Sequence, residues 1–299
     1  MSVTTQRVLL AVPNVSEGAD PATLTAIGQA FATAGAQLLT PRPHADADHG
    51  RAVFTLAGTP GALAHALLAG AREAVARIDL TAHHGTHPHV GAIDVVPIVH
   101  LDDARRGAAC AEALLAADLL GTELGLPVFL YGALAQGRTR ADLRRGGLAE
   151  LTKRIAAGEL KPDFGPAAKP HPSAGAVLVA ARPPLVAFNV ELAAPATIAD
   201  ARRIAALIRE GGEQGLPGLR AIGLDLPSRD GVAQISMNVE RPLDTPLSDV
   251  IAAIAKHARI AEAELVGVAP RAAFGGFPDD LVCRNRATIE DALAATSPA

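Results

Sequence analysis

The sequence has few aromatic and few sulfur-containing side chains. It contains no tryptophan and a single tyrosine, Tyr131, among 299 residues. Stacking of ligands on aromatic rings is therefore excluded as a main mode of binding. Two cysteines, Cys110 and Cys283, do not make a disulfide framework. Both are expected to be small buried residues, and this cysteine usage is typical of the reducing cytoplasm.

The sequence also lacks an excess of positive charge and a long apolar run. Its formal net charge of −4 provides no general attraction to nucleic acid or to an anionic membrane. No run approaches the roughly 18 apolar residues that are needed to span a bilayer. The apolar stretch near the start is too short for a signal peptide and predicts a first strand. We therefore expect a cytoplasmic protein without nucleic-acid or membrane partners.

Aliphatic residues and a repeated order of elements are what the sequence does have. Hydrophobic residues make up 49% of the chain and charged residues 19%, as in a packed globular protein, and the length favours two domains. Apolar periodicity predicts strand, helix, strand, strand, helix and strand at 7–12, 21–34, 36–40, 51–57, 60–78 and 92–99. The same order is predicted at 185–192, 197–208, 219–226, 232–239, 246–258 and 263–268.

Two copies of a βαββαβ order are typical of two ferredoxin-like subdomains in an α+β fold. We expect the helices outside and the two sheets packed face to face, with a ligand groove between the halves. We place one domain at residues 1–175 and the other at 176–299. A helix, a strand, a basic stretch and a linker rich in proline and glycine, residues 161–175, separate the two copies.

Four of the ten histidines fall in the segment from His83 to Gly91. Glycine and proline exclude a regular helix there, and imidazole both takes and gives a proton near neutrality. The segment therefore predicts either a proton-transfer loop or a solvated polar loop. Asp94 follows on the next strand, where it either orients an imidazole or faces solvent. Cys110 lies in a predicted apolar helix, so a thiol nucleophile is not expected.

Two other loops are predicted to lie near the histidine segment. The segment from Val12 to Gly18 offers Asn14, Ser16 and Glu17 at the end of the first strand. The segment from His44 to Arg51 adds Asp46, Asp48 and His49. A mixed cluster of histidine and aspartate is one way to bind zinc or manganese. The spacing matches no recognised metal site, so no metal is expected, and a metalloenzyme stays an alternative.

Several motifs make the sequence similar to the glutamate formimidoyltransferase family, including the transferase part of formimidoyltransferase–cyclodeaminase. The most specific motif is IDLTAHHGTHPHVGAIDV, residues 78–95. The segments VPNVSEG, GRAVFTLAG, PDFGP and VAFNVEL extend the resemblance over nearly the whole chain, at residues 12–18, 50–58, 162–166 and 186–192.

The resemblance implies transfer of a formimidoyl group from N-formimidoyl-L-glutamate to N5 of tetrahydrofolate, in histidine degradation. Tetrahydrofolate would be the co-substrate, no metal would be needed, and the protein would be a homodimer. The histidine before the proline, His87, matches the family's catalytic position. We expect support from Asp46, Asp94 and His83. We expect substrate to be bound by Asn14, Ser16, Glu17, Arg51 and Gly85.

The resemblance also implies that folate binds to the linker between the subdomains. The matching residues are Gly165, Pro166, Ala167, Ala168, Lys169, Pro170, His171, Pro172, Ser173, Ala174 and Gly175. Both substrates carry carboxylates, which require cationic partners. Arg51, Arg182 and Lys169 are the candidates near the motifs. Two further alternatives remain on this scaffold, namely transfer of a formyl group from N-formylglutamate and a folate-binding protein without activity.

Overall fold

The computed structural model describes residues 8–32, 35–83, 85–226, 229 and 231–296. The chain divides into two compact units, Met1–Pro183 and Pro184–Ala299. We had placed the division at residue 175, but it lies further along the chain. The reason is that strand β9 (Val177–Arg182) pairs in parallel with β7 (Ile93–Val99) and β8 (Val128–Leu130) of the first unit. The mixed helix and sheet content and the two separate sheets confirm the predicted α+β class.

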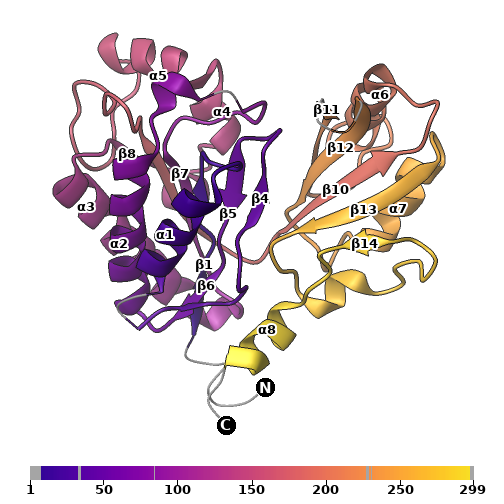
Figure 1. Ribbon diagram of the computed structural model, residues 1–299, viewed down its shortest axis with the longest axis horizontal. Helices are drawn as coiled ribbons and strands as arrows, with labels where there is room; N and C mark the ends of the chain where they lie inside the picture. Colours follow the sequence, from indigo (N-terminus) through magenta and orange to yellow (C-terminus); the bar gives the residue numbers. More distant parts are fainter. Residues whose placement is uncertain (1–7, 33–34, 84, 227–228, 230, 297–299) are drawn as a thin grey trace. The chain divides into compact units, whose positions relative to one another are not determined.

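One sheet organises the first unit (Figure 1). Its hydrogen-bonded order is β3-β6-β1-β7-β2-β5-β4, and β9 lies beside β7 with β8 beyond it. The other strands of this sheet are β1 (Leu9–Ala11), β2 (Asn14–Val15), β3 (Gln37–Leu38), β4 (His44–Asp46), β5 (Arg51–Val53), β6 (Leu56–Gly58), β7 (Ile93–Val99) and β8 (Val128–Leu130).

Breaks in two strands shape one end of this sheet. Pro13 has no N–H to donate, and it separates β1 from β2. The predicted strand 51–57 is likewise divided into β5 and β6. The uninterrupted strand β7, buried along its whole length, pairs with β1 near Val99 and with β2 near Ile93. The short strands β2, β5 and β4 therefore form a separate corner beside the start of β7.

Helices cover both faces of the first sheet. One side carries α1 (Pro21–Phe31), α2 (Ala62–Arg77) and α3 (Arg106–Leu124). Asp20 caps α1 by accepting a hydrogen bond from Ala22 N, and Ile27 and Phe31 are fully buried in the core beneath it. The other side carries α4 (Arg140–Arg144) and α5 (Gly147–Ala156).

The second pair of helices changes the predicted layering. Leu143 and Ile155 from these helices pack with Val95 of β7 and Leu178 of β9. The face that we expected to be bare of helices in this unit is therefore partly covered. Short 3-10 turns lie at η2 (Leu80–Ala82), η3 (Asp103–Arg105) and η4 (Gly132–Leu134).

The second unit contains a five-stranded sheet in the order β11-β12-β10-β13-β14. Its elements are β10 (Val186–Leu192), α6 (Ile198–Ile208), β11 (Leu219–Leu226), β12 (Val232–Val239), α7 (Leu247–Ala255), β13 (Ile260–Val266), η6 (Arg271–Phe274), β14 (Cys283–Arg284) and α8 (Ile289–Thr296). Val186, Phe188 and Val190 join the core with α6 and α7, whereas Asn189 and Glu191 alternate to the opposite face. A helix that is both long enough and apolar enough to cross a bilayer is absent from the described part of the chain.

Candidate active site

Three neighbouring strands bring the candidate side chains together in the first unit. Asn14 on β2 pairs across the sheet with Val53 of β5 and with Val95 of β7. Arg51 begins β5, and Asp94 is the second residue of β7. Arg51 donates hydrogen bonds from Nε and Nη2 to Asn14 Oδ1, the first at 2.8 Å. The corner formed by the strand breaks therefore holds an amide, a guanidinium and a carboxylate in contact.

The histidine loop lies against the loop that precedes Arg51. Thr86 donates to the carbonyl oxygen of Asp48 through its N–H, at 3.0 Å, and through its hydroxyl, at 2.8 Å. His87 N donates to the carbonyl oxygen of His49 at 3.4 Å. A Cβ atom built on Gly85 would lie 2.4 Å from that same carbonyl oxygen and 2.8 Å from Gly50 Cα. Glycine is therefore required at 85 for the two loops to approach.

His87 is partly buried, and its imidazole contacts a cation. Arg51 Nη1 lies 2.6 Å from Nδ1 of His87, and the carbonyl oxygen of Pro88 lies 2.8 Å from the same nitrogen. Burial lowers the pKa of His87 well below its ordinary value, and the charges of Arg51 and Arg144 lower it further. The ring is therefore neutral at physiological pH, and in that form one of its nitrogens carries a lone pair.

Asp94 does not orient the imidazole directly, in contrast to the expectation from the sequence. Its Oδ1 accepts a hydrogen bond from Val90 N at 2.8 Å, and its Oδ2 receives Arg144 Nη2. Arg51 Nη1 lies 3.5 Å from the same Oδ2. Asp94 thus acts on His87 through Arg51 and Arg144, because the buried carboxylate contacts these two guanidinium groups and one backbone amide.

Burial also affects Arg51 itself. Burial and the nearby charge of Arg144 lower the pKa of Arg51 to about 9, against the opposing effect of Asp94. The guanidinium is therefore still protonated at neutral pH. A buried cation in this place holds Asn14 and His87 in fixed positions and disfavours a second positive charge on the imidazole.

Asp46 holds His49 rather than His87. Asp46 Oδ1 accepts a hydrogen bond from His49 N at 2.9 Å and lies 3.0 Å from His49 Nδ1. The centre of the His49 ring is 6.2 Å from that of His87. His83 packs edge-on against His89, with ring centres 4.2 Å apart, and its imidazole lies close to Gly50 and Gly85. His84 lies outside the described residues.

A metal centre would require several ligand side chains around one point. Within the described ranges, no group of three or more histidine, cysteine, aspartate or glutamate side chains is arranged to hold an ion. Asp46 instead contacts His49, and Asp94 contacts Arg51 and Arg144.

Two of the predicted substrate-binding residues form hydrogen bonds between their side chains and the backbone. Ser16 is buried, and its hydroxyl donates to the carbonyl oxygen of Gly91 at 2.8 Å. Glu17 Oε1 accepts hydrogen bonds from Ala19 N at 2.6 Å and from Asp20 N at 2.9 Å. Ser16 therefore fixes the entry to β7, and Glu17 closes the turn before α1. Neither side chain reaches His87 through a contact in the described residues.

A cavity of about 420 Å³ opens beside His87. Its lining residues are Gly85, Thr86, His87, Pro88, His89, Arg144, Gly146, Gly147 and Leu148. The sequence motifs did not identify Arg144, Gly146, Gly147 or Leu148. The only signal for Arg144 was the basic stretch between Arg138 and Arg154, which contains several arginines and does not distinguish one of them.

The linker is tied down at both ends and exposed between them. Gly165 has a φ of 76°, and a Cβ there would lie 2.1 Å from the carbonyl oxygen of Leu126. Gly175 has a φ of 70°, and a Cβ there would lie 2.1 Å from the carbonyl oxygen of Val90. His171 and Gly175 exchange backbone hydrogen bonds of 2.8 and 3.0 Å. Within Gly165–Gly175, the exposed residues of the linker are Gly165, Pro166, Ala167, Ala168, Lys169 and Pro172.

The far end of the linker contacts the histidine loop. Ala176 N donates to Val90 O, and Ala92 N donates to Ala174 O, both at 2.9 Å. Pro170 and Ala174 are buried, whereas Pro172 is exposed and Ser173 is partly buried. The segment that leaves His87 and the segment that ends the linker therefore run together.

The second unit has a polar group of its own on the sheet face opposite α6 and α7. Glu191 receives Arg229 and Arg284, and Asn189 donates to Glu264 at 3.1 Å. Burial raises the pKa of Glu191, although both arginines oppose that effect.

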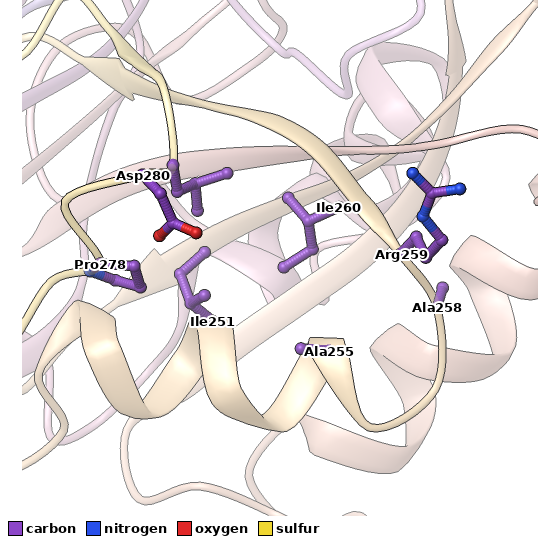
Figure 2. A pocket seen from close by; sticks show the side chains of 8 residues that line it. Ile251, Ala255, Ala258, Arg259, Ile260, Pro278 and Asp280 are labelled. Atoms are coloured by element: carbon purple, nitrogen blue, oxygen red, sulfur yellow. The ribbon is translucent and has the colours of Figure 1, made fainter.

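A second cavity, of about 330 Å³, lies in this unit between α7, β13 and the segment before β14 (Figure 2). Ile251 and Ile260 form its apolar wall, and Arg259 and Asp280 are its charged lining residues. It contains neither a histidine nor a cysteine among its lining residues, so it offers no group for proton transfer near neutrality.

Known proteins resemble this chain along nearly its full length. Residues 8–182 match the formiminotransferase domain, N-terminal subdomain, and residues 187–278 match the formiminotransferase domain. A glutamate formimidoyltransferase of Streptococcus pyogenes serotype M1 is 34% identical over 273 residues, which cover 88% of this chain and 89% of that protein.

Two further relatives give the same picture. A glutamate formimidoyltransferase of Thermoplasma acidophilum is 32% identical over 88% of each chain. A formimidoyltransferase-cyclodeaminase of Gallus gallus is 35% identical over 88% of this chain and 50% of its own length. The chain thus spans about half of the bifunctional relative and nearly all of the single-function ones. On these matches, the chain belongs to the formiminotransferase family.

Proposed function

We propose that the protein transfers a formimidoyl group from N-formimidoyl-L-glutamate to N5 of tetrahydrofolate, as a step of histidine degradation. The observation that carries the proposal is the neutral imidazole of His87, which opens on a cavity and is held by Arg51. The named activity of the single-function relatives supports the same reaction.

The reaction requires one proton to be moved between two nitrogens. N5 of tetrahydrofolate attacks the formimidoyl carbon and gives its proton to His87. The bond between that carbon and the glutamate nitrogen then breaks, and His87 returns the proton to the departing nitrogen. The products are 5-formimidoyltetrahydrofolate and glutamate. A neutral imidazole suits both steps, because it accepts first and donates second.

The partners of His87 keep it in the form that starts this cycle. Arg51 Nη1 and the carbonyl oxygen of Pro88 both lie within hydrogen-bond distance of Nδ1. Nδ1 accepts from Arg51 in the tautomer where it carries the lone pair. In the other tautomer Nδ1 donates to Pro88 O, and Nε2 carries the lone pair that accepts the proton. Asn14 and Asp94 fix the position of Arg51 and therefore act on the ring indirectly.

Folate is proposed to bind along the linker, Gly165–Gly175. The exposed segment from Gly165 to Lys169 is held between two anchors, and the second anchor contacts the backbone that follows His87. A ligand on this segment would therefore lie on a support that is continuous with the histidine loop. Lys169, at the exposed end, is a candidate partner for a folate carboxylate.

The strand orders support a ferredoxin-like topology for both units. The second unit has the strand order β11-β12-β10-β13, and the first unit has the order β3-β6-β1-β7. Corresponding strands of the two βαββαβ copies therefore follow the same spatial order. The face-to-face packing of the sheets, the homodimer and the cytoplasmic location stay predictions.

A transfer assay with purified protein tests the function. Tetrahydrofolate is incubated with N-formimidoyl-L-glutamate or with N-formyl-L-glutamate, and the folate products are identified by mass spectrometry. We expect 5-formimidoyltetrahydrofolate from the first donor and a much lower rate with the second. A faster reaction with N-formyl-L-glutamate would mean that the formyl compound, and not the formimidoyl compound, is the donor. Folate binding by calorimetry without any turnover would leave a binding protein instead of an enzyme.

A further inference from the structure

The charged side chains around His87 carry more positive than negative charge. Arg51 and Arg144 both approach the single carboxylate Asp94, which is almost completely buried. The charges of Arg144 and Arg140 both lower the pKa of Arg51, which places a third guanidinium within electrostatic range. His87 is neutral and adds no charge. One carboxylate therefore faces several guanidinium groups, and an anionic ligand would restore the balance.

Arg144 is the cation of this group that lines the cavity. Its Nη2 contacts Asp94, whereas its Nε is buried and has no hydrogen-bond partner among the residues that the structure describes. A buried guanidinium donor without an acceptor is uncommon, because guanidinium groups in proteins are usually satisfied by a carboxylate or a phosphate. The residue thus combines a structural contact with Asp94 and a donor that is left for another acceptor.

The wall next to Arg144 leaves room for that acceptor. Gly146 and Gly147 line the cavity, with φ values of 73° and 67°. A Cβ built on Gly147 would meet no atom within 4 Å, so the space beside it is open. Arg144 and His87 therefore share one open cavity, and a small ligand in it reaches both side chains.

We propose that Arg144 binds the α-carboxylate of the formimidoyl donor and so sets the donor specificity of the site. The inference rests on the proposed function and adds to it the residue that recognises the donor. The α-carboxylate sits on the same carbon as the nitrogen that leaves, whereas the side-chain carboxylate is two methylene groups further away. Because His87 must return a proton to that nitrogen, the α-carboxylate is the anionic group that lies in the same cavity as His87.

The test combines variants of the protein with analogues of the donor. N-formimidoyl-4-aminobutyrate lacks the α-carboxylate, and N-formimidoyl-L-2-aminobutyrate lacks the side-chain carboxylate. We expect the wild-type protein to prefer the full donor over the first analogue by about 10- to 100-fold in kcat/KM, as for a hydrogen bond between charged groups. Arg144→Gln should reduce that preference to within about threefold.

A neighbouring arginine provides the matched control. Arg145→Gln removes the same charge from an exposed side chain that does not line the cavity, and it should keep the wild-type preference. Arg144→Lys keeps a positive charge near Asp94 and should retain part of the preference, even if Arg144→Gln folds poorly. The preference is a ratio measured on one protein sample, so a smaller folded fraction does not change it.

Each other outcome overturns the inference. If Arg144→Gln slows all donors equally, Arg144 only holds Asp94 in place. If the preference for the side-chain carboxylate collapses instead, the site binds that group. If Arg144→Gln loses rate with tetrahydrofolate but not with tetrahydropteroate, which lacks the glutamate tail, Arg144 binds the folate tail. A wild-type protein that transfers nothing from the full donor would instead contradict the proposed function.

Discussion

Arg51 Nη1 lies 2.6 Å from Nδ1 of His87, so the partner of the candidate catalytic imidazole is a cation. Imidazoles that act as general bases are commonly oriented by a carboxylate, which stabilises the protonated ring. A guanidinium has the opposite effect, because it only donates hydrogen bonds and repels a second positive charge. The geometry therefore favours a base that is neutral before it meets the substrate and that releases its proton readily afterwards.

His87→Asn should remove most of the transfer activity and leave the fold intact. The asparagine keeps a polar group of similar size beside Arg51, but it cannot exchange a proton near neutrality. We expect kcat to fall by about 10²- to 10⁴-fold, as for the loss of a general acid and base. Steady-state kinetics and a urea unfolding curve measure the two effects. A decrease of less than tenfold would mean that another group moves the proton.

Much of the fold was predictable because the local signals are strong. The strands at 219–226 and 232–239 were predicted with their observed bounds, since alternating apolar residues lie on either side of a short turn. The helix at 197–208 was likewise found almost residue for residue, because Thr197 and Asp200 form a capping box there.

The contacts of the site were less predictable, because they join residues that lie far apart in the chain. The sequence pointed to Asp94 and Arg51 but not to Arg144, which reaches Asp94 from α4 across the sheet. Ser16 belongs to the VPNVSEG motif and was predicted to bind substrate, yet its hydroxyl donates to the backbone carbonyl oxygen of Gly91. Motifs identify which residues lie near the site, whereas the partner of each side chain depends on the packing of other elements.

The pKa of His87 should rise when the charge of Arg51 is removed. Burial is the largest cause of the lowered pKa, and the charge of Arg51 is the next. Arg51→Met should therefore move the pKa upward toward the ordinary value without restoring it fully, because burial remains. Arg51→Lys keeps the charge and should shift the pKa much less. NMR titration of the histidine ring protons, with His87→Asn to assign the signal, measures both.

The same shift sets how stability depends on pH. The folded protein holds His87 neutral at a pH where the unfolded chain already binds a proton, so the unfolded state gains protons first as the pH falls. His87 should therefore lower the free energy of unfolding as the pH falls below about 6.5, the ordinary value for histidine. Urea unfolding of the wild-type and His87→Asn proteins should show a smaller loss at acid pH in the variant. An equal loss in both proteins would contradict the depressed pKa.

Gly85→Ala should loosen the contact between the two loops. The added methyl group would lie 2.4 Å from His49 O and 2.6 Å from His83 Nε2, so the loops must separate. We expect a loss of about 1–3 kcal/mol in the free energy of unfolding, as for overpacking, together with reduced activity. Gly107→Ala is the matched control, because a Cβ there would meet no atom within 4 Å and alanine favours the helix α3. Equal stability of the two variants would show that the loops do not need to be this close.

Glu112→Ala should destabilise the first unit without changing the chemistry of the site. Glu112 is buried on α3, and its two oxygens accept hydrogen bonds from Gly61 N at 2.6 Å and from Ala64 N at 2.7 Å, where α2 begins. Loss of the carboxylate leaves two amides of the helix start without an acceptor, which costs about 2–3 kcal/mol. Glu123→Ala, at an exposed position on the same helix, should change stability by less than about 0.5 kcal/mol. A similar loss in both variants, measured by urea unfolding, would show that Glu112 acts only through the helix propensity of α3.

Tetrahydrofolate should protect the linker from hydrogen exchange. The amides of Ala167, Ala168 and Lys169 lie on the exposed part, whereas Gly175 N and Ala176 N already donate to His171 O and Val90 O. We expect bound folate to slow exchange at the exposed amides and to leave the already bonded ones nearly unchanged, because only the first group gains a covering ligand. Mass spectrometry of exchanged peptides measures this, with the exposed Asp279–Asp280 loop as an internal control that should not respond. If calorimetry shows that folate binds while the linker peptide exchanges as in the free protein, the folate site lies elsewhere and the linker serves only to join α5 to β9.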